Sequence, residues 1–253
     1  MAHMIDDYTA KSFKAKHDFL VSSLSSGYTP DQKPFAVLLG GQSGAWKTKL
    51  HKVIKRNNDD NIIVINGDEF RKLHPNFKAI QDRYGIDSPA YTAKWAGQMT
   101  EALIDAFSSQ GYNLIVEGTL RTSEVPLRTA ALLRERGYSA SLAIMAVKPQ
   151  ISLISCQIRY EMMRLAGTTP HATDPNHHNN IVQDIVDNLA VLESSDLFDG
   201  VLIYDRAGNC LFPTSDDASA TEVLRNVLFG PWTIEEELHY QHLQDHLEEL
   251  KKR

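Results

Sequence analysis

The sequence predicts an α/β fold with a central parallel sheet of about five strands, flanked by helices. Short, continuous apolar runs are the first sign, and they occur at residues 35–39, 62–65, 114–116, 142–147 and 201–204. Such runs are typical of strands buried on both faces of a sheet. Helical patterns separate them, at residues 46–56, 88–109, 124–136, 150–165 and 179–195. This alternation favours right-handed crossovers and a parallel sheet covered on both sides.

Both ends of the chain are predicted to be helical. Residues 5–27 carry apolar side chains at roughly helical spacing, and residues 231–253 are charged with a helical pattern. Thr233 is the predicted N-cap for the second of these helices, because an acidic first turn follows it. Residues 210–212 are candidates for a short strand at the edge of the sheet.

We therefore expect one domain over residues 5–230, a helical extension over residues 231–253, and a cloning remnant at residues 1–4. Cys156 and Cys210 have apolar neighbours and form no C-x-x-C pair, so we expect two buried, reduced thiols.

The composition limits the classes of function. The chain has 253 residues, of which 42% are hydrophobic and 23% charged, as is ordinary for a globular protein. Its formal net charge of -6 disfavours a broad surface for nucleic acid. No apolar run approaches the ~18 residues of a membrane span. The N-terminus shows no basic stretch followed by an apolar core, so a cytoplasmic protein is expected.

A glycine-rich segment follows the first predicted strand and opens the next helix. It resembles the P-loop pattern G-x-x-x-x-G-K-S/T, in which backbone N–H groups surround a phosphate. In that pattern the lysine contacts the β- and γ-phosphates of a nucleotide, and the Ser or Thr hydroxyl binds Mg²⁺. A glycine-rich turn without a ligand is the alternative. The expected nucleotide-binding residues are Gly41, Gln42, Ser43, Gly44, Ala45, Trp46, Lys47 and Thr48.

Trp46 departs from this pattern, because the residue before the lysine is normally glycine. A large ring there stands beside the expected anion, and the backbone conformation of that position is one that a Cβ resists. We therefore expect nucleotide binding to be weakened or absent.

Asp68 follows the second predicted strand. Ligands of open parallel sheets bind beyond the carboxyl ends of the strands, so Asp68 is expected on the same edge as the phosphate loop. A carboxylate there can accept the proton of an attacking hydroxyl during phosphoryl transfer. The alternative is that Asp68 only caps the short helix after it.

Other polar residues follow the third predicted strand or lie on helices. Glu117 is a candidate to hold a water on Mg²⁺, and Thr119 and Arg121 are candidates to contact a polar, anionic substrate. The alternative for these residues is a capped helix start with a solvated arginine. Arg159 is a candidate to neutralise charge on a transferring phosphoryl group, although a lone helix arginine is more often a surface residue.

The neighbouring histidines at positions 177 and 178 favour a helix start over a metal site, because adjacent helical residues point about 100° apart.

With these residues assembled, nearly the whole chain, about residues 5–230, resembles the zeta-toxin family. The segments that carry the resemblance include residues 38–45, 67–71, 74–75, 111–122, 125–126, 148–149, 158–161, 177–178 and 228–232. The Glu-Gly-Thr-Leu-Arg-Thr string at residues 117–122 is the most specific of them.

The resemblance implies a P-loop kinase that uses ATP or GTP with Mg²⁺. It implies transfer of phosphate to the 3′-hydroxyl of UDP-N-acetylglucosamine, which blocks peptidoglycan synthesis, and an antitoxin protein as partner. In this reading Asp68 looks like the base, Lys47 the phosphate-binding lysine and Thr48 a Mg²⁺ ligand. The residues that then line the sugar-nucleotide cleft are Glu101, Thr119, Arg121 and Thr129.

Arg159 looks like the first of two arginines that clamp the γ-phosphate. The second departure lies at the other clamp position, where His171 stands in a His-Ala-Thr segment instead of an arginine. A histidine is only partly charged at neutral pH and lacks the forked guanidinium, so we expect impaired activity. Two alternatives remain: a non-catalytic protein that binds a UDP-sugar and an antitoxin, and a P-loop kinase for another small molecule such as an antibiotic.

Overall fold

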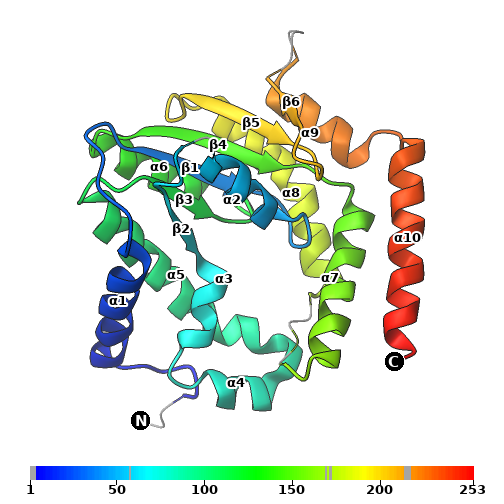
Figure 1. Ribbon diagram of the computed structural model, residues 1–253, viewed down its shortest axis with the longest axis horizontal. Helices are drawn as coiled ribbons and strands as arrows, with labels where there is room; N and C mark the ends of the chain where they lie inside the picture. The colour runs from blue at the N-terminus through cyan, green and yellow to red at the C-terminus, as the bar shows by residue number, and fades with distance from the viewer. Residues whose placement is uncertain (1–3, 57, 169, 171–172, 214–217) are drawn as a thin grey trace.

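A six-stranded sheet forms the centre of the protein (Figure 1). The computed structural model describes residues 4–56, 58–168, 170, 173–213 and 218–253. The strands are β1 Phe35–Gly40, β2 Ile63–Asn66, β3 Leu114–Glu117, β4 Ser139–Met145, β5 Gly200–Tyr204 and β6 Cys210–Phe212. Their order is β2-β3-β1-β4-β5-β6, and the first five strands are parallel. The prediction of about five parallel strands is confirmed, and β6 is an antiparallel edge strand.

Helices connect the strands and cover the sheet. The α-helices are α1 Ala10–Ser25, α2 Lys47–Arg56, α3 Gly67–Phe70, α4 Phe77–Tyr84, α5 Ser88–Ser108, α6 Glu124–Glu135, α7 Pro149–Leu165, α8 Pro175–Glu193, α9 Ala220–Phe229 and α10 Ile234–Lys251. Two short 3₁₀ helices, Arg71–Leu73 and Gly85–Asp87, complete the described elements. The predicted helices are present with ends shifted by a few residues, and α3 is the short helix considered at Asp68, whereas α4 and α9 have no counterpart in the sequence prediction.

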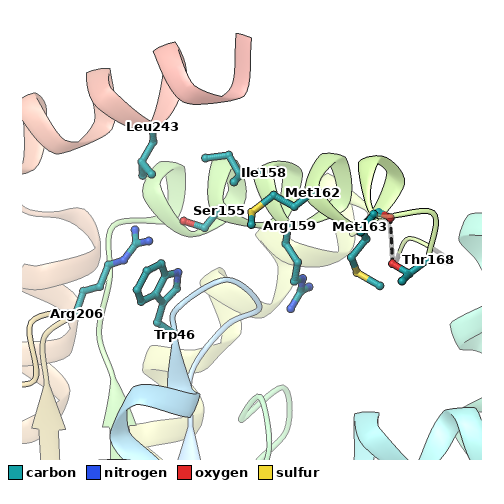
Figure 2. A pocket seen from close by; sticks show the side chains of 10 residues that line it. Trp46, Ser155, Ile158, Arg159, Met162, Met163, Thr168, Arg206 and Leu243 are labelled. Atoms are coloured by element: carbon teal, nitrogen blue, oxygen red, sulfur yellow. Dashed lines mark hydrogen bonds between the residues drawn. The ribbon is translucent and has the colours of Figure 1, made fainter. Parts of the chain in front are cut away.

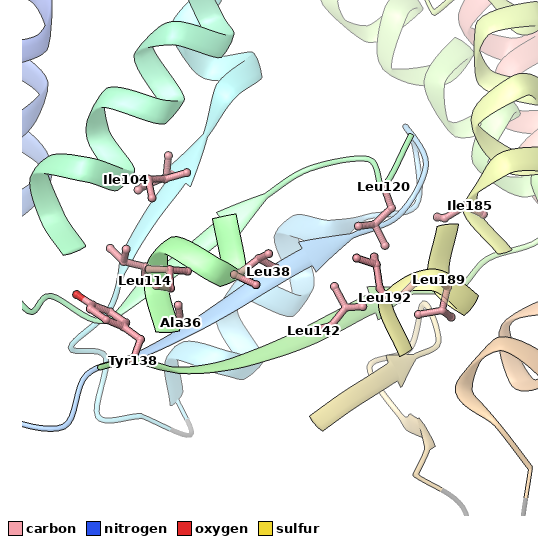
Figure 3. Close-up of a cluster of buried hydrophobic side chains, with 14 of the residues drawn as sticks. Ala36, Leu38, Ile104, Leu114, Leu120, Tyr138, Leu142, Ile185, Leu189 and Leu192 are labelled. Atoms are coloured by element: carbon pink, nitrogen blue, oxygen red, sulfur yellow. The ribbon is translucent and has the colours of Figure 1, made fainter. Parts of the chain in front are cut away.

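Two apolar cores lie on the two faces of the sheet, because successive residues of a strand point to opposite sides. From β1, Ala36 and Leu38 belong to the larger core, which packs against α1, α5, α6, α8 and α9 (Figure 3). Val37 and Leu39 point the other way, toward α2 and the beginning of α7. With both faces covered, the carboxyl ends of the parallel strands are the edge that remains for ligands.

The C-terminal helix α10 lies beside α7 at the far side of the molecule from α1 (Figure 1). Thr233 is its N-cap, as predicted, and accepts a hydrogen bond from the backbone of Glu236 in a capping box. Leu247 and Leu250 of α10 pack against Ile154 and Ile158 of α7 in a small separate core.

The short linker between α9 and α10 is tied to the body of the protein. The buried Lys148 ammonium donates to the carbonyl oxygens of Gly230 and Pro231, at 2.8 and 3.3 Å.

The expectation of two buried thiols is half right. Cys156 is buried, whereas Cys210 is exposed, because it begins β6, a three-residue strand at the edge of the sheet. Among the described residues, no helix is both long and apolar enough to cross a membrane.

Candidate active site at the edge of the sheet

The loop between β1 and α2 is held firmly against the first turn of α7. At Gly44 the φ angle is +79°, and an added Cβ would lie 2.0 Å from the carbonyl oxygen of Ser152, so only glycine fits. The fully buried Gln42 donates from Nε2 to the Val147 carbonyl at 2.7 Å and to the Ser152 hydroxyl at 3.3 Å. The conformation of the predicted phosphate loop is therefore fixed by its contacts with the start of α7.

His178 adds a second anchor behind the loop. Its Nε2 lies 2.9 Å from the Ser152 hydroxyl, and its ring is almost completely buried. The Ser152 hydroxyl donates to the Pro149 carbonyl at 2.9 Å, so it accepts the hydrogen bond from His178. This pair joins the first turn of α8, whose N-cap is Asp174, to α7 and the loop. The prediction that the two adjacent histidines mark a helix start is confirmed.

Lys47 lies inside the loop and bonds to the loop itself. Its ammonium donates to the carbonyl oxygens of Gly41 and Gln42, at 2.8 and 3.3 Å. Thr48 follows it in the exposed first turn of α2. The loop therefore holds the Lys47 ammonium against its own carbonyl oxygens.

Charges from three elements surround the Lys47 ammonium. Burial lowers the pKa of Lys47, the carboxylates of Glu117 and Asp68 oppose that shift, and Arg159 adds to it. Glu117 Oε1 lies 3.7 Å from the ammonium. The residues after β1, β2 and β3 thus share one edge of the sheet with α7, and the predicted common edge for Lys47 and Asp68 is confirmed.

Trp46 adopts the conformation that its position demands. Its φ angle is +69°, in the left-handed region that favours glycine, so the expected backbone strain is present. The indole points out of the loop into a groove beneath α7 and is 54% exposed (Figure 2). The Arg206 guanidinium stacks over the ring with its Cζ 4.2 Å from the ring centroid.

The groove that contains Trp46 has a volume of about 340 Å³. Arg159 lines it from α7 and points toward the loop (Figure 2). Arg206 lines it from the turn between β5 and β6. Two cationic side chains therefore border the groove, and an indole fills part of the space between them.

Asp68 lies in the first turn of α3, directly beyond β2. The cap of this helix is Asn66, whose side-chain oxygen accepts from the Asp68 backbone N–H at 3.1 Å. Because another residue caps the helix, the alternative role for Asp68 is excluded. Its carboxylate is 72% exposed, and Oδ1 accepts a hydrogen bond from Arg71 Nε at 2.9 Å.

Glu117 ends β3 and is the more enclosed carboxylate. Besides Lys47, it accepts a hydrogen bond from Asn66 Nδ2 at 3.2 Å, and its Oε2 lies 2.8 Å from His51 Nε2. Mg²⁺ in nucleotide sites takes one or two carboxylates together with water and phosphate oxygens. The Glu117 carboxylate and the Thr48 hydroxyl at the adjoining helix start fit that donor set.

Thr119 and Arg121 lie on the loop from β3 to α6, on either side of a strained residue. Leu120 is buried with a φ angle of +54°, and its carbonyl oxygen accepts from Asn188 Nδ2 at 2.9 Å. Strained backbone of this kind persists only where the surroundings fix it. Asn188 is a residue that the sequence analysis missed, because no local pattern links it to position 120.

Glu101 and Thr129 lie on α5 and α6. Glu101 Oε1 forms an exposed 2.6 Å ion pair with Arg128, and the Thr129 hydroxyl donates to the Val125 carbonyl of its own helix. Within the described part of the chain no direct bond joins either residue to Asp68, so their place in a substrate cleft stays a prediction. His171 lies outside the described residues.

Comparisons with known proteins identify the family to which this chain belongs. The zeta toxin family model matches residues 21–217. Toxin PezT of Streptococcus pneumoniae serotype 4 (strain ATCC BAA-334 / TIGR4) is 42% identical over 237 residues, which cover 92% of this chain and 94% of that protein. Toxin zeta of Streptococcus pyogenes is 35% identical over 220 residues, which cover 87% of this chain and 76% of that protein.

Solved structures give the same result. A chain from the PezAT chromosomal toxin–antitoxin system of Streptococcus pneumoniae superposes with a TM-score of 0.89 at 39% identity, and the match covers 99% of this chain and 100% of that one. A chain of the AvrRxo1-ORF1:-ORF2 complex with ATP has a TM-score of 0.60 at 12% identity and covers 95% of this chain and 84% of that chain, a likeness of fold alone. On the family model and these identities, the chain belongs to the zeta toxin family.

Proposed function

We propose that this protein is a kinase toxin that transfers the γ-phosphate of ATP or GTP to the 3′-hydroxyl of UDP-N-acetylglucosamine. The observation that carries the proposal is the pairing of a largely enclosed lysine in the phosphate loop, with a side chain 10% exposed, and an exposed carboxylate on the same edge of the sheet. The first group suits a phosphate donor, and the second suits an acceptor hydroxyl. Membership of the zeta toxin family supports this assignment.

The proposal gives each candidate residue a role. Lys47 and the backbone N–H groups of residues 41–46 bind the phosphates, while Arg159 neutralises charge from α7. Asp68 accepts the proton of the sugar hydroxyl. Thr48, and Glu117 through a water, would hold the proposed Mg²⁺, which would neutralise charge on the phosphate oxygens. Glu101, Thr119, Arg121 and Thr129 are proposed to bind the UDP-sugar.

We also propose that this copy is impaired on its nucleotide side. The Trp46 ring lies in the groove between the loop and α7 and is stacked with Arg206, so a nucleotide that enters this groove must displace the ring or share the space with it. His171 replaces the expected second arginine, and an arginine of that role contributes ~10³-fold or more to the rate by analogy with arginine fingers.

An antitoxin is the proposed partner, since the structural relative belongs to a toxin–antitoxin system. The proposed consequence of the reaction is a block in peptidoglycan synthesis, which starts from a cytoplasmic sugar nucleotide. The cytoplasm is therefore the proposed location.

The experiment is isothermal titration calorimetry of the protein and of Trp46→Gly, each with ATP and with UDP-N-acetylglucosamine, followed by a phosphate-transfer assay. We expect the sugar nucleotide to bind both forms, and ATP to bind Trp46→Gly more tightly with a gain in transfer. Trp46→Gly combined with Lys47→Met is the control, and it should lose the recovered ATP binding.

The other outcomes discriminate between functions. Sugar binding by both forms without ATP binding by either would favour the non-catalytic binding protein. A Trp46→Gly protein that phosphorylates other small molecules and ignores the UDP-sugar would favour a kinase of different specificity.

A further inference from the structure

Arg71 contacts the proposed base, and its own side chain is held in place by further hydrogen bonds. Its Nε donates to Asp68 Oδ1 at 2.9 Å. Its Nη1 donates to the Pro89 carbonyl at 2.7 Å and to the Thr92 hydroxyl at 3.1 Å, both on α5. The Arg71 side chain is only 25% exposed, and Thr92 is buried. One guanidinium therefore connects the long helix α5 to the exposed carboxylate.

A neighbouring ion pair with the same spacing lacks this anchoring. Glu69 and Lys72 have the same three-residue spacing on the same segment and lie 2.6 Å apart. Their side chains are 63% and 61% exposed, and Lys72 has no other recorded partner in the described part of the chain. Such an exposed ion pair does little to fix the orientation of either side chain. Arg71 differs because a planar guanidinium can use its separate N–H groups on partners in fixed directions.

We propose that Arg71 is a positioning residue for Asp68. It fixes Oδ1 of the carboxylate and leaves Oδ2 turned to the acceptor, where it takes the hydroxyl proton. As that proton moves to Asp68, the sugar oxygen forms its bond to the γ-phosphorus, and the bond from phosphorus to the departing nucleoside diphosphate breaks. The inference rests on the proposed kinase function and adds a residue to it.

The kinetic test compares variants in the Trp46→Gly background, with ATP and UDP-N-acetylglucosamine as substrates. Arg71→Gln should lower kcat by ~10- to 100-fold with little change in KM, because a misplaced reacting group slows the chemical step. Arg71→Lys should recover part of the loss, since it retains the charge without the fork. Lys72→Gln is the matched control and should leave kcat unchanged.

A double substitution separates positioning from a simple structural role. If Arg71 acts through the base, Arg71→Gln should cause no further loss of kcat in a protein that already carries Asp68→Asn. Thr92→Val removes one anchor without changing the size of the side chain, and it should give a smaller loss in the same direction. An unchanged kcat in Arg71→Gln, or a rise in KM alone, would overturn the inference and leave the kinase proposal intact.

A structural measurement decides the case if Trp46→Gly transfers no phosphate, an outcome that would count against the proposed function. A crystal structure of Arg71→Gln should then show the Asp68 carboxylate displaced or in several orientations. A carboxylate in its original place would show that Arg71 does not position it.

Discussion

The two sides of the proposed active site are built in opposite ways. On the donor side, Lys47 and Gln42 donate hydrogen bonds to backbone carbonyl oxygens, and Gly44 lies tightly against α7. On the acceptor side, the Asp68 carboxylate is mostly exposed and accepts a hydrogen bond from Arg71. The donor side is closely packed, whereas the acceptor side is exposed to solvent.

Because of this difference, substitutions on the two sides should affect the stability of the fold and the activity to different degrees. Because the donor loop is packed against the first turn of α7, a change there should disturb the fold as well as the chemistry. A change at an exposed carboxylate removes a reacting group and leaves packing untouched. Substitutions on the two sides should therefore give different combinations of kinetic and unfolding effects.

Asp68→Asn should have the largest effect, and it should be confined to catalysis. In a Trp46→Gly protein we expect kcat to fall by about 10²- to 10⁴-fold, the range for removal of a general base. The free energy of unfolding, measured by urea denaturation, should change by less than about 0.5 kcal/mol. Glu69→Gln, one residue along the same helix, is the control. An equal loss of kcat in that variant would remove Asp68 from its proposed role.

Gly44→Ala should be the most damaging change to the donor side. The new Cβ would meet the Ser152 carbonyl at 2.0 Å and Cys156 Sγ at 2.8 Å, so the loop or α7 must move. We expect a loss of about 3 kcal/mol or more in unfolding free energy.

Gly137→Ala is the matched control for that variant, because Gly137 has a φ angle of +81° and open space around it. It should cost only about 1–2 kcal/mol, the penalty of the left-handed conformation. Equal losses in the two variants would mean that contact with α7 does not decide the shape of the loop.

His178→Gln should change how stability depends on pH. Burial lowers the pKa of His178 below its ordinary value of 6.5, and the contact with Asn179 opposes the shift only in part. The unfolded chain then binds the proton more readily than the folded one, so stability is lost as pH falls below 6.5.

The melting temperature of the unsubstituted protein should therefore drop more between about pH 7.5 and about pH 5.5 than that of His178→Gln. His177→Gln, at the exposed neighbouring position, is the control and should keep most of the drop, because His177 is the smallest of the causes that shift the pKa of His178. Identical drops in all three proteins would show that the histidine behind the donor loop does not contribute to the pH dependence.

Arg128→Ala should have the smallest effect. The ion pair of Arg128 with Glu101 is exposed on both sides, and pairs of this kind contribute about 0–1 kcal/mol. We expect a change in unfolding free energy below about 0.5 kcal/mol that vanishes in high salt. A larger loss in urea denaturation would mean that the acceptor side is less open than the exposure of its groups indicates.

The sheet and the shared edge could be read from the sequence, because both follow from local patterns. Apolar runs mark the buried strands, and the glycine-rich loop and Asp68 each follow one of them. Helix α9 was missed even though Ser219 and Glu222 form a capping box at its start. Helix α4 has only eight residues, too few for a clear period.

The remaining features depend on contacts between distant parts of the chain. The strain at Trp46 was foreseen from its neighbours, but its stacking on Arg206 joins positions 160 residues apart. The anchoring of Arg71 by Thr92 and of Leu120 by Asn188 likewise connects elements that are distant in the sequence. No spacing along the sequence encodes such contacts, since they arise only when tertiary packing brings the elements together.

The position of α10 has a consequence for anyone who shortens this protein. A version ended at residue 230, the domain limit expected from the sequence, would retain Lys47, Asp68 and Arg159. It would also strip Leu247 and Leu250 from the outer side of α7, where they cover Ile154 and Ile158. Arg159 comes directly after Ile158 on α7. A truncated protein that has lost activity would therefore have lost the packing that holds α7 and Arg159 in place, and not a residue that takes part in the reaction.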